Sequence, residues 1–235
     1  AEINVYHSLN IEKNDKNAML LLAKILKETG KQWRSIKLFL KLRKVCNNDI
    51  EKIKEIDSEN ILMFSYKEKY ISAIKYINKY CNGYYCEEKN RIYKYLLQKI
   101  TKLNNLNKFK EAKLLSNEAL KKLKIDDIKI KNAILNEFEI ASNIVELKSF
   151  PRSLTISLTE KCNLKCKMCS QSKMVSNELT KLQVEKLIKL FPYLENILWV
   201  GGEVFLYNGF EKLMDLANKY DIKQNITSNG LLISE

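Results

Sequence analysis

Through residues 1–148, apolar side chains recur almost only at helical spacing. The first example has apolar residues at positions i, i+3, i+4 and i+7, which lie on one face of a helix: Met19, Leu22, Ala23 and Leu26. Gly30 ends that helix, and a second apolar stripe begins at Trp33. Only six glycines and two prolines occur in 235 residues, which favours long helices joined by short connections.

The same helix–turn–helix outline returns around residues 70–77 and 109–119. Small residues at equivalent positions recur about every 38–39 residues: Ser35, Ala73 and Ala112. This part resembles degenerate tetratricopeptide repeats, with consensus-like residues at Ala23, Gly30, Ser35 and Phe39. Asn47 stands where that repeat usually has proline. The alternative is an irregular helical domain without true repeats. Stacked repeats would bury their apolar faces against each other and present a curved surface for a protein or peptide.

Residues 131–150 are predicted to form a last helical stretch and a linker, with apolar residues at Ile134, Phe138, Ile140 and Val145. Pro151 marks a boundary, because the residue before proline is disfavoured in a helix. Beyond it, the pattern predicts strands at 154–159, 196–200 and 224–227 and helices at 180–190 and 210–220. The second strand is almost entirely apolar, which is typical of a strand covered on both faces. Such alternation indicates parallel strands joined by right-handed crossovers.

We therefore predict an α + α/β chain, with an all-α helical-repeat domain at 1–148 and an α/β domain at 149–235. The strongest chemical signal lies after the first strand of the α/β part, where Cys162, Cys166 and Cys169 follow one another as C-x3-C-x2-C. A structural zinc site usually takes four protein ligands, and the only histidine, His7, is distant. Three thiolates instead suit an iron–sulfur cluster in which one iron lacks a protein ligand. The alternative is packing on one helix face, because the spacing is also i, i+4, i+7.

Two further segments each follow a predicted strand, as the cysteines do. Gly201-Gly202-Glu203 follows the second predicted strand, and Thr227-Ser228-Asn229-Gly230 follows the third. Either alone would indicate an ordinary turn. Together with the cysteines, however, they resemble the radical S-adenosylmethionine (radical SAM) superfamily, most closely its branch with C-terminal SPASM or twitch extensions. Each motif follows its own strand. In α/β barrels the active-site residues likewise lie at the carboxyl ends of the strands.

That resemblance implies a [4Fe–4S] cluster on Cys162, Cys166 and Cys169, with S-adenosylmethionine chelating the fourth iron. Reductive cleavage would give a 5′-deoxyadenosyl radical that abstracts hydrogen from a substrate, so the catalysis is cofactor-based. The electron would come from a donor such as flavodoxin or ferredoxin. The resemblance also implies cofactor contacts at Gly201, Gly202, Glu203, Met168, Ser228 and Asn229. Glu203 would meet the methionine amino group, and Met168 would lie near the adenine or else in the core.

Two departures from the family pattern stand out. Val204 replaces the proline that usually follows the glutamate. The family core is a partial barrel of about six strand–helix units, whereas only about the first three are present here. We therefore expect the chain to be a fragment of a longer enzyme that does not turn over alone.

Composition and net charge add little to this functional interpretation. The net charge is +13, from 41 Lys and Arg against 28 Asp and Glu, but along the chain the two signs are interleaved. Nucleic-acid binding is therefore disfavoured, although a zinc-binding nucleic-acid module stays an alternative. The sequence contains no run of about 18 apolar residues, so it predicts no membrane span. Six cysteines without a signal peptide favour a reducing, cytoplasmic location, with ordinary thiols at Cys46, Cys81 and Cys86. The alternative function is protein binding by the helical part, with a radical SAM domain that has only a structural role.

Overall fold

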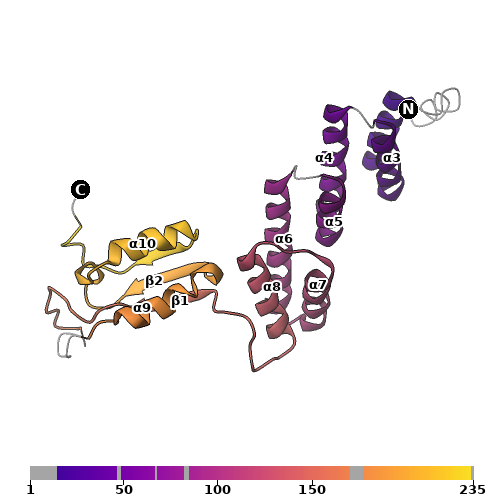
Figure 1. Cartoon of the computed structure of the whole chain (residues 1–235). Coiled ribbons are helices and arrows are strands. Elements are labelled where there is room, and N and C mark those ends of the chain that lie inside the picture. The colour runs from indigo at the N-terminus through magenta and orange to yellow at the C-terminus, as the bar shows by residue number, and fades with distance from the viewer. Residues whose placement is uncertain (1–14, 47–48, 67, 82–84, 170–176, 234–235) are drawn as a thin grey trace. The chain divides into compact units, whose positions relative to one another are not determined.

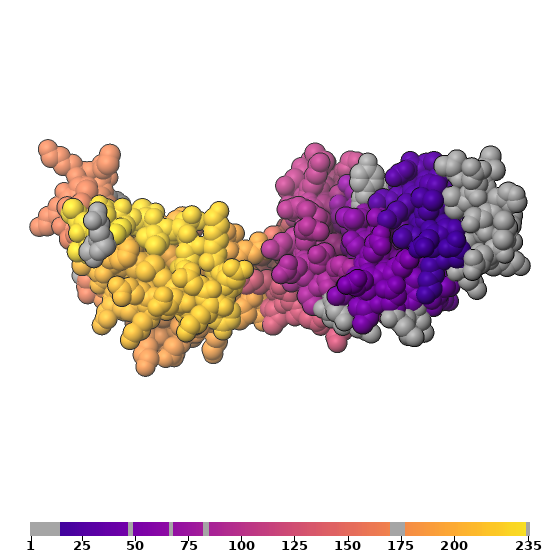
Figure 2. All heavy atoms as spheres, turned by 90° about the horizontal axis from the view of Figure 1, so that it is seen from above, coloured from indigo at the N-terminus to yellow at the C-terminus, as the bar shows by residue number. Residues whose placement is uncertain are grey.

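The computed structural model describes residues 15–46, 49–66, 68–81, 85–169 and 177–233. The chain divides into two compact units, Ala1–Lys99 and Ile100–Glu235. In Figures 1 and 2 the first unit is coloured from indigo to purple and the second from magenta to yellow. The domain boundary at 148/149 stays a prediction. No helix in the described ranges is long and apolar enough to cross a membrane.

The N-terminal unit is helical. Its helices are α2 (Lys16–Glu28), α3 (Gln32–Val45), α4 (Ile50–Tyr66) and α5 (Tyr70–Tyr80), followed by most of α6 (Cys86–Asn105). Helices α2 and α3 pack closely, because Ser35 is fully buried and its hydroxyl donates a 2.7 Å hydrogen bond to the carbonyl oxygen of Ala23. The corresponding Ala73 and Ala112 are also fully buried. A small residue therefore does stand at the equivalent helix contacts, while the tetratricopeptide interpretation stays a prediction.

The C-terminal unit combines helices with a small sheet. Its elements after α6 are α7 (Phe109–Lys122), α8 (Ile128–Ala141), β1 (Ser153–Ser157), α9 (Lys181–Ile188), η2 (Phe191–Tyr193), β2 (Asn196–Val200), η3 (Val204–Leu206), α10 (Phe210–Lys219) and β3 (Lys223–Ile226). Both strand pairs are parallel, in the order β1-β2-β3 (Figure 1). The predicted α + α/β class is confirmed at this level. Residues 131–150 were predicted to form a helical stretch and a linker; the helix ends at Ala141, and Val145 of the linker is 91% exposed.

The apolar core around the sheet lies on one of its faces. Ile197 and Trp199 of β2 are fully buried in one cluster with Val184 of α9 and Leu213 of α10. Leu198 points to the other face and is 36% exposed. The prediction that both faces of this strand are covered is therefore wrong within the described residues. A parallel sheet with its helices on one face is the arrangement of a barrel wall, whose other face points inward.

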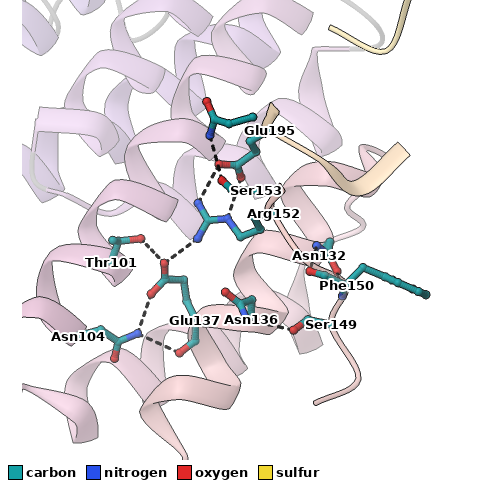
Figure 3. A network of polar contacts seen from close by, with 11 residues as sticks. Thr101, Asn104, Asn132, Asn136, Glu137, Ser149, Phe150, Arg152, Ser153 and Glu195 are labelled. Atoms are coloured by element: carbon teal, nitrogen blue, oxygen red, sulfur yellow. Dashed lines mark hydrogen bonds and ion pairs between the residues drawn. The ribbon is translucent and has the colours of Figure 1, made fainter. Parts of the chain in front are cut away.

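A buried polar network fixes α8 to the start of the sheet (Figure 3). The Arg152 guanidinium makes two hydrogen bonds to the carboxylate of Glu195, at 2.9 and 3.1 Å, and one of 2.9 Å to Glu137. Glu137 on α8 also accepts hydrogen bonds from Thr101 at 2.6 Å and Asn104 at 2.7 Å. Because Glu137 is buried, these contacts hold α6 and α8 against the residue that leads into β1.

Candidate functional site

The three predicted motifs lie in loops at the same edge of the sheet. The cysteine loop follows β1, Gly201-Gly202-Glu203 follows β2, and Thr227-Ser228-Asn229-Gly230 follows β3. Because all three strands are parallel, their carboxyl ends meet at one edge. The fold thus brings together the loops that the sequence separates by up to 67 positions, as between Cys162 and Asn229.

The cysteine loop is exposed but anchored at its beginning. Thr159 pairs with Glu178 in an isolated antiparallel bridge, and the Thr159 hydroxyl donates a 3.1 Å hydrogen bond to the Glu178 carboxylate. The Lys161 ammonium forms a 2.8 Å ion pair with the same carboxylate, and this contact, more than any other, lowers the pKa of Glu178. Sequence reasoning missed Glu178, because its distance along the chain from the cysteines gave no signal.

The thiols of Cys162, Cys166 and Cys169 are all exposed, and none of the six cysteines forms a disulfide. A turn joins the last two, where the amide of Cys169 donates to the carbonyl of Cys166 at 3.1 Å. In the described part of the chain, no three His, Cys, Asp or Glu side chains converge closely enough to hold a single metal ion. The donor set nevertheless suits a cluster, because thiolates are the usual protein ligands of iron–sulfur clusters and each can meet its own iron.

The two glycines bring the β2 loop against the cysteine loop. A Cβ atom on Gly201 would stand 2.3 Å from the Thr159 carbonyl oxygen, and one on Gly202 would stand 2.1 Å from that of Lys161. This close approach permits two backbone hydrogen bonds of 2.8 Å, from the amide of Gly202 to Thr159 and from that of Glu203 to Lys161. The space beside the two glycines is filled by the backbone of the cysteine loop. The cofactor contacts predicted at Gly201 and Gly202 stay a prediction.

Glu203 is fully buried and joins the β2 and β3 loops. One carboxylate oxygen accepts from the Ser228 hydroxyl at 2.9 Å and from the Phe205 amide at 3.3 Å. The other accepts from the Asn229 amide at 2.9 Å. A ligand ammonium would have to share or replace one of these three donors. The described geometry therefore gives Glu203 a role in holding loops, in addition to the cofactor contact that the resemblance implies.

Asn229 completes the connection back to the cysteines. Its side-chain amide donates to the Asn163 side-chain oxygen at 2.7 Å and lies 3.9 Å from the sulfur of Cys162. Asn163 lies between the first two cysteines, and sequence reasoning gave it no role. Met168, by contrast, is 95% exposed, so the alternative that it belongs to the core is wrong.

Comparison with known proteins agrees with these motifs. Residues 156–235 match the family model described as the Radical SAM superfamily. Among curated relatives, a GTP 3′,8-cyclase of Aquifex aeolicus is 33% identical over 92 residues, covering 35% of this chain and 29% of the relative. Molybdenum cofactor biosynthesis protein 1 of Dictyostelium discoideum is 38% identical over 90 residues, covering 34% of this chain and 14% of the relative.

Sporulation killing factor maturation protein SkfB of Bacillus subtilis is 36% identical over 85 residues, covering 34% of this chain and 21% of that protein. The chain thus spans less than a third of the length of each of these relatives. No solved structure matches at comparable significance. The similarity to the Radical SAM superfamily is confined to residues 156–235.

Proposed function

We propose that this chain is part of a radical SAM enzyme in which Cys162, Cys166 and Cys169 hold a [4Fe–4S] cluster. The observation that carries the proposal is the hydrogen-bonded connection among the three loops. The cysteine loop touches the β2 loop through Thr159 and Lys161, Glu203 joins the β2 and β3 loops, and Asn229 returns to Cys162. Three family motifs that follow separate strands thus form one continuous site.

The residues present fit this cofactor set. Three exposed thiols supply three ligands and leave one iron for a small molecule. When bound, the cluster would supply the electron for reductive cleavage of S-adenosylmethionine, and this radical chemistry would remove a hydrogen atom from the substrate. The chain's own residues position the cysteine loop. Gly201 and Gly202 permit its contact with the β2 loop, and Asn229 holds it through Asn163.

S-adenosylmethionine would lie against the same loops, with Gly201, Gly202, Glu203, Ser228 and Asn229 as its proposed neighbours and Met168 available from the cysteine loop. The proposed electron donor is a protein such as flavodoxin or ferredoxin. A peptide or protein is the substrate class we propose, on the similarity to a maturation protein. Because of the similarity to a GTP cyclase, a nucleotide is the alternative substrate class that should be tested beside the peptide.

The proposal is tested by electron paramagnetic resonance of the anaerobically reconstituted, dithionite-reduced protein, with and without S-adenosylmethionine. We expect a [4Fe–4S]⁺ signal that shifts when the cofactor is added. Replacement of Cys162, Cys166 or Cys169 by alanine should abolish loading. The matched control is Cys86→Ser, which changes an exposed cysteine of the helical unit and should retain the iron.

Full iron retention in all three alanine variants would overturn the proposal. Zinc bound after aerobic purification, together with salt-dependent nucleic-acid binding, would support the zinc module instead. A longer chain that binds its partner but never cleaves S-adenosylmethionine would support a structural radical domain.

A further inference from the structure

Positive charge is concentrated on two helices of the N-terminal unit. Helices α3 and α5 contain no acidic residue. Their exposed cations are Arg34, Lys37, Lys41 and Lys44 on α3 and Lys75 and Lys79 on α5. These six residues are called the basic face below. Residues 32–45 and 70–80 thus depart from the interleaving of the two signs elsewhere in the chain.

On each helix the cations point away from the unit's own core. The α3 cations fall at i, i+3, i+7 and i+10, opposite the buried Ile36, Phe39 and Leu42. Those of α5 fall at i and i+4, opposite the buried Ala73 and Ile77. Both stripes therefore face solvent over their whole length.

The two helices are neighbours at both ends. At their beginnings, the ammonium of Lys69 lies 4.2 Å from the ring centroid of Trp33. At their ends, the Arg43 guanidinium donates a 2.5 Å hydrogen bond to the Tyr80 carbonyl and lies 5.2 Å from the Tyr80 ring. These contacts join the beginnings of the two helices to each other and their ends to each other, which gives the helices the same direction and places the two stripes on neighbouring helices.

The basic face has no acidic partner within the described residues. Elsewhere in the unit cations are paired: Lys24 and Lys27 of α2 bind Glu55 and Glu59 of α4 at 2.7 and 2.6 Å. Asp57 is buried and pairs with Arg43, which is not part of the face. Three of the four acidic residues of α4 are thus occupied by other cations. Lys79 lies 5.0 Å from the ring centroid of Tyr80, and the charge of the six cations is available for an external anion.

A small apolar pocket lies at the beginning of the same two helices. Its volume is about 250 Å³, and its lining includes Trp33, Ile36, Met63 and Phe64 together with the polar Gln32 and Lys69. Such a volume accommodates one large apolar side chain. Trp33 of the pocket lining is next to Arg34 of the basic face, so one extended ligand that passes over the beginning of α3 can reach both.

We propose that this surface binds an acidic polypeptide segment, which places one large apolar side chain in the pocket and its carboxylates along the basic face. A polypeptide fits better than a single-stranded nucleic acid, because base stacking needs open aromatic rings. The exposed aromatic of this surface, Trp33, already has Lys69 over its ring. The binding site itself is independent of the radical chemistry, and only the partner's role as substrate rests on the proposed function.

The test is fluorescence anisotropy of a labelled glutamate-rich peptide with a single phenylalanine, titrated with the whole chain at low salt. Lys37→Glu, Lys41→Glu and Lys44→Glu are combined in one variant. The matched control reverses three exposed lysines of α7, namely Lys110, Lys113 and Lys121. We expect the first variant to weaken binding about tenfold or more and the control to weaken it less than threefold, because screened surface contacts are worth up to about 1 kcal/mol each. Trp33→Ala should weaken binding of this peptide. It should not weaken binding of a second peptide in which alanine replaces the phenylalanine.

Equal loss in both triple variants would overturn the proposal, because it would show only an effect of net charge. Tighter binding of a single-stranded oligonucleotide, abolished by the α3 variant, would overturn it in favour of nucleic acid. Cys162→Ala is expected to bind the peptide like the unmodified chain. Peptide binding that survives the loss of the cluster therefore separates this inference from the radical SAM proposal.

Discussion

Glu203→Gln tests whether the buried glutamate holds the site together without any ligand. The carboxylate accepts three hydrogen bonds, and glutamine offers one oxygen and one NH₂ group in the same space. In the least costly orientation the amide oxygen keeps the bond from Asn229, and the Ser228 hydroxyl turns to accept from the NH₂ group. In the unmodified chain the Phe205 amide lies 3.3 Å from a carboxylate oxygen of Glu203. In the variant it faces the NH₂ group, which is also a donor.

The expected cost follows from these contacts. An unsatisfied buried amide costs about 1–3 kcal/mol, so Glu203→Gln should lower the free energy of unfolding of the C-terminal unit by about that amount. Glu203→Ala removes the acceptor for all three donors, and we expect a loss of about 3–5 kcal/mol. Glu211→Gln, an exposed change on α10, should stay within about 0.5 kcal/mol.

Urea unfolding followed by tryptophan fluorescence measures this directly. Each unit contains one tryptophan, so a Trp33→Phe background leaves the buried Trp199 to report on the C-terminal unit alone. Hydrogen exchange at the Asn229 amide should accelerate in both Glu203 variants. The reasoning is refuted if Glu203→Ala unfolds within about 1 kcal/mol of the unmodified chain and exchange at Asn229 is unchanged. Glu203 would then serve a ligand and not the loops.

Three further changes are checked with simple assays. Gly202→Ala places a Cβ 2.1 Å from a backbone oxygen, so we expect a loss of about 1–3 kcal/mol in the same urea assay; an unchanged midpoint would contradict the close contact. Arg152→Ala leaves the buried Glu137 without its cation and should cost about 3 kcal/mol, whereas Arg152→Met combined with Glu137→Gln should recover part of that loss. Burial raises the pKa of Cys81 to about 12, so at pH 8 iodoacetamide should modify the exposed Cys86 well before Cys81, as mass spectrometry would show. Because the same thiol ionises near 9.0 in the unfolded chain, its contribution should make the N-terminal unit less stable as the pH rises from 9 to 12.

The strands and motifs were predictable because their signals are local. β2 begins and ends as predicted, at Asn196 and Val200, and β1 and β3 differ from the prediction by one or two residues. Alternation and apolar runs depend on neighbouring positions only. The end of α8 at Ala141 was not predicted, because the linker after it carries apolar residues such as Val145 that no core covers. Apolar character alone does not distinguish a buried helix face from an exposed linker.

The partners within the site were not predictable, because they depend on how distant loops meet. Glu203 was expected to face a ligand, yet its nearest donors come from Ser228 and Asn229, some 25 positions along the chain. Glu178 gave no signal, although it anchors the loop that carries the cysteines. Charge behaves in the same way. Over most of the sequence it is interleaved, but residues 32–45 and 70–80 contain no acidic residue, and contacts near the ends of α3 and α5 bring these two segments together.

The loop contacts bear on how a cofactor would bind. A loop of three exposed cysteines that was free to move would lose conformational entropy when it closed on a cluster, at roughly 1–2 kcal/mol for each residue ordered. Here the loop begins in a bridge to Glu178, is bonded to the β2 loop at Lys161, and is held to the β3 loop by Asn229. Part of that entropy is already lost on folding, which favours binding by preorganisation. Changes at Gly202, Glu203 and Asn229 should therefore weaken iron retention although none of them is an iron ligand.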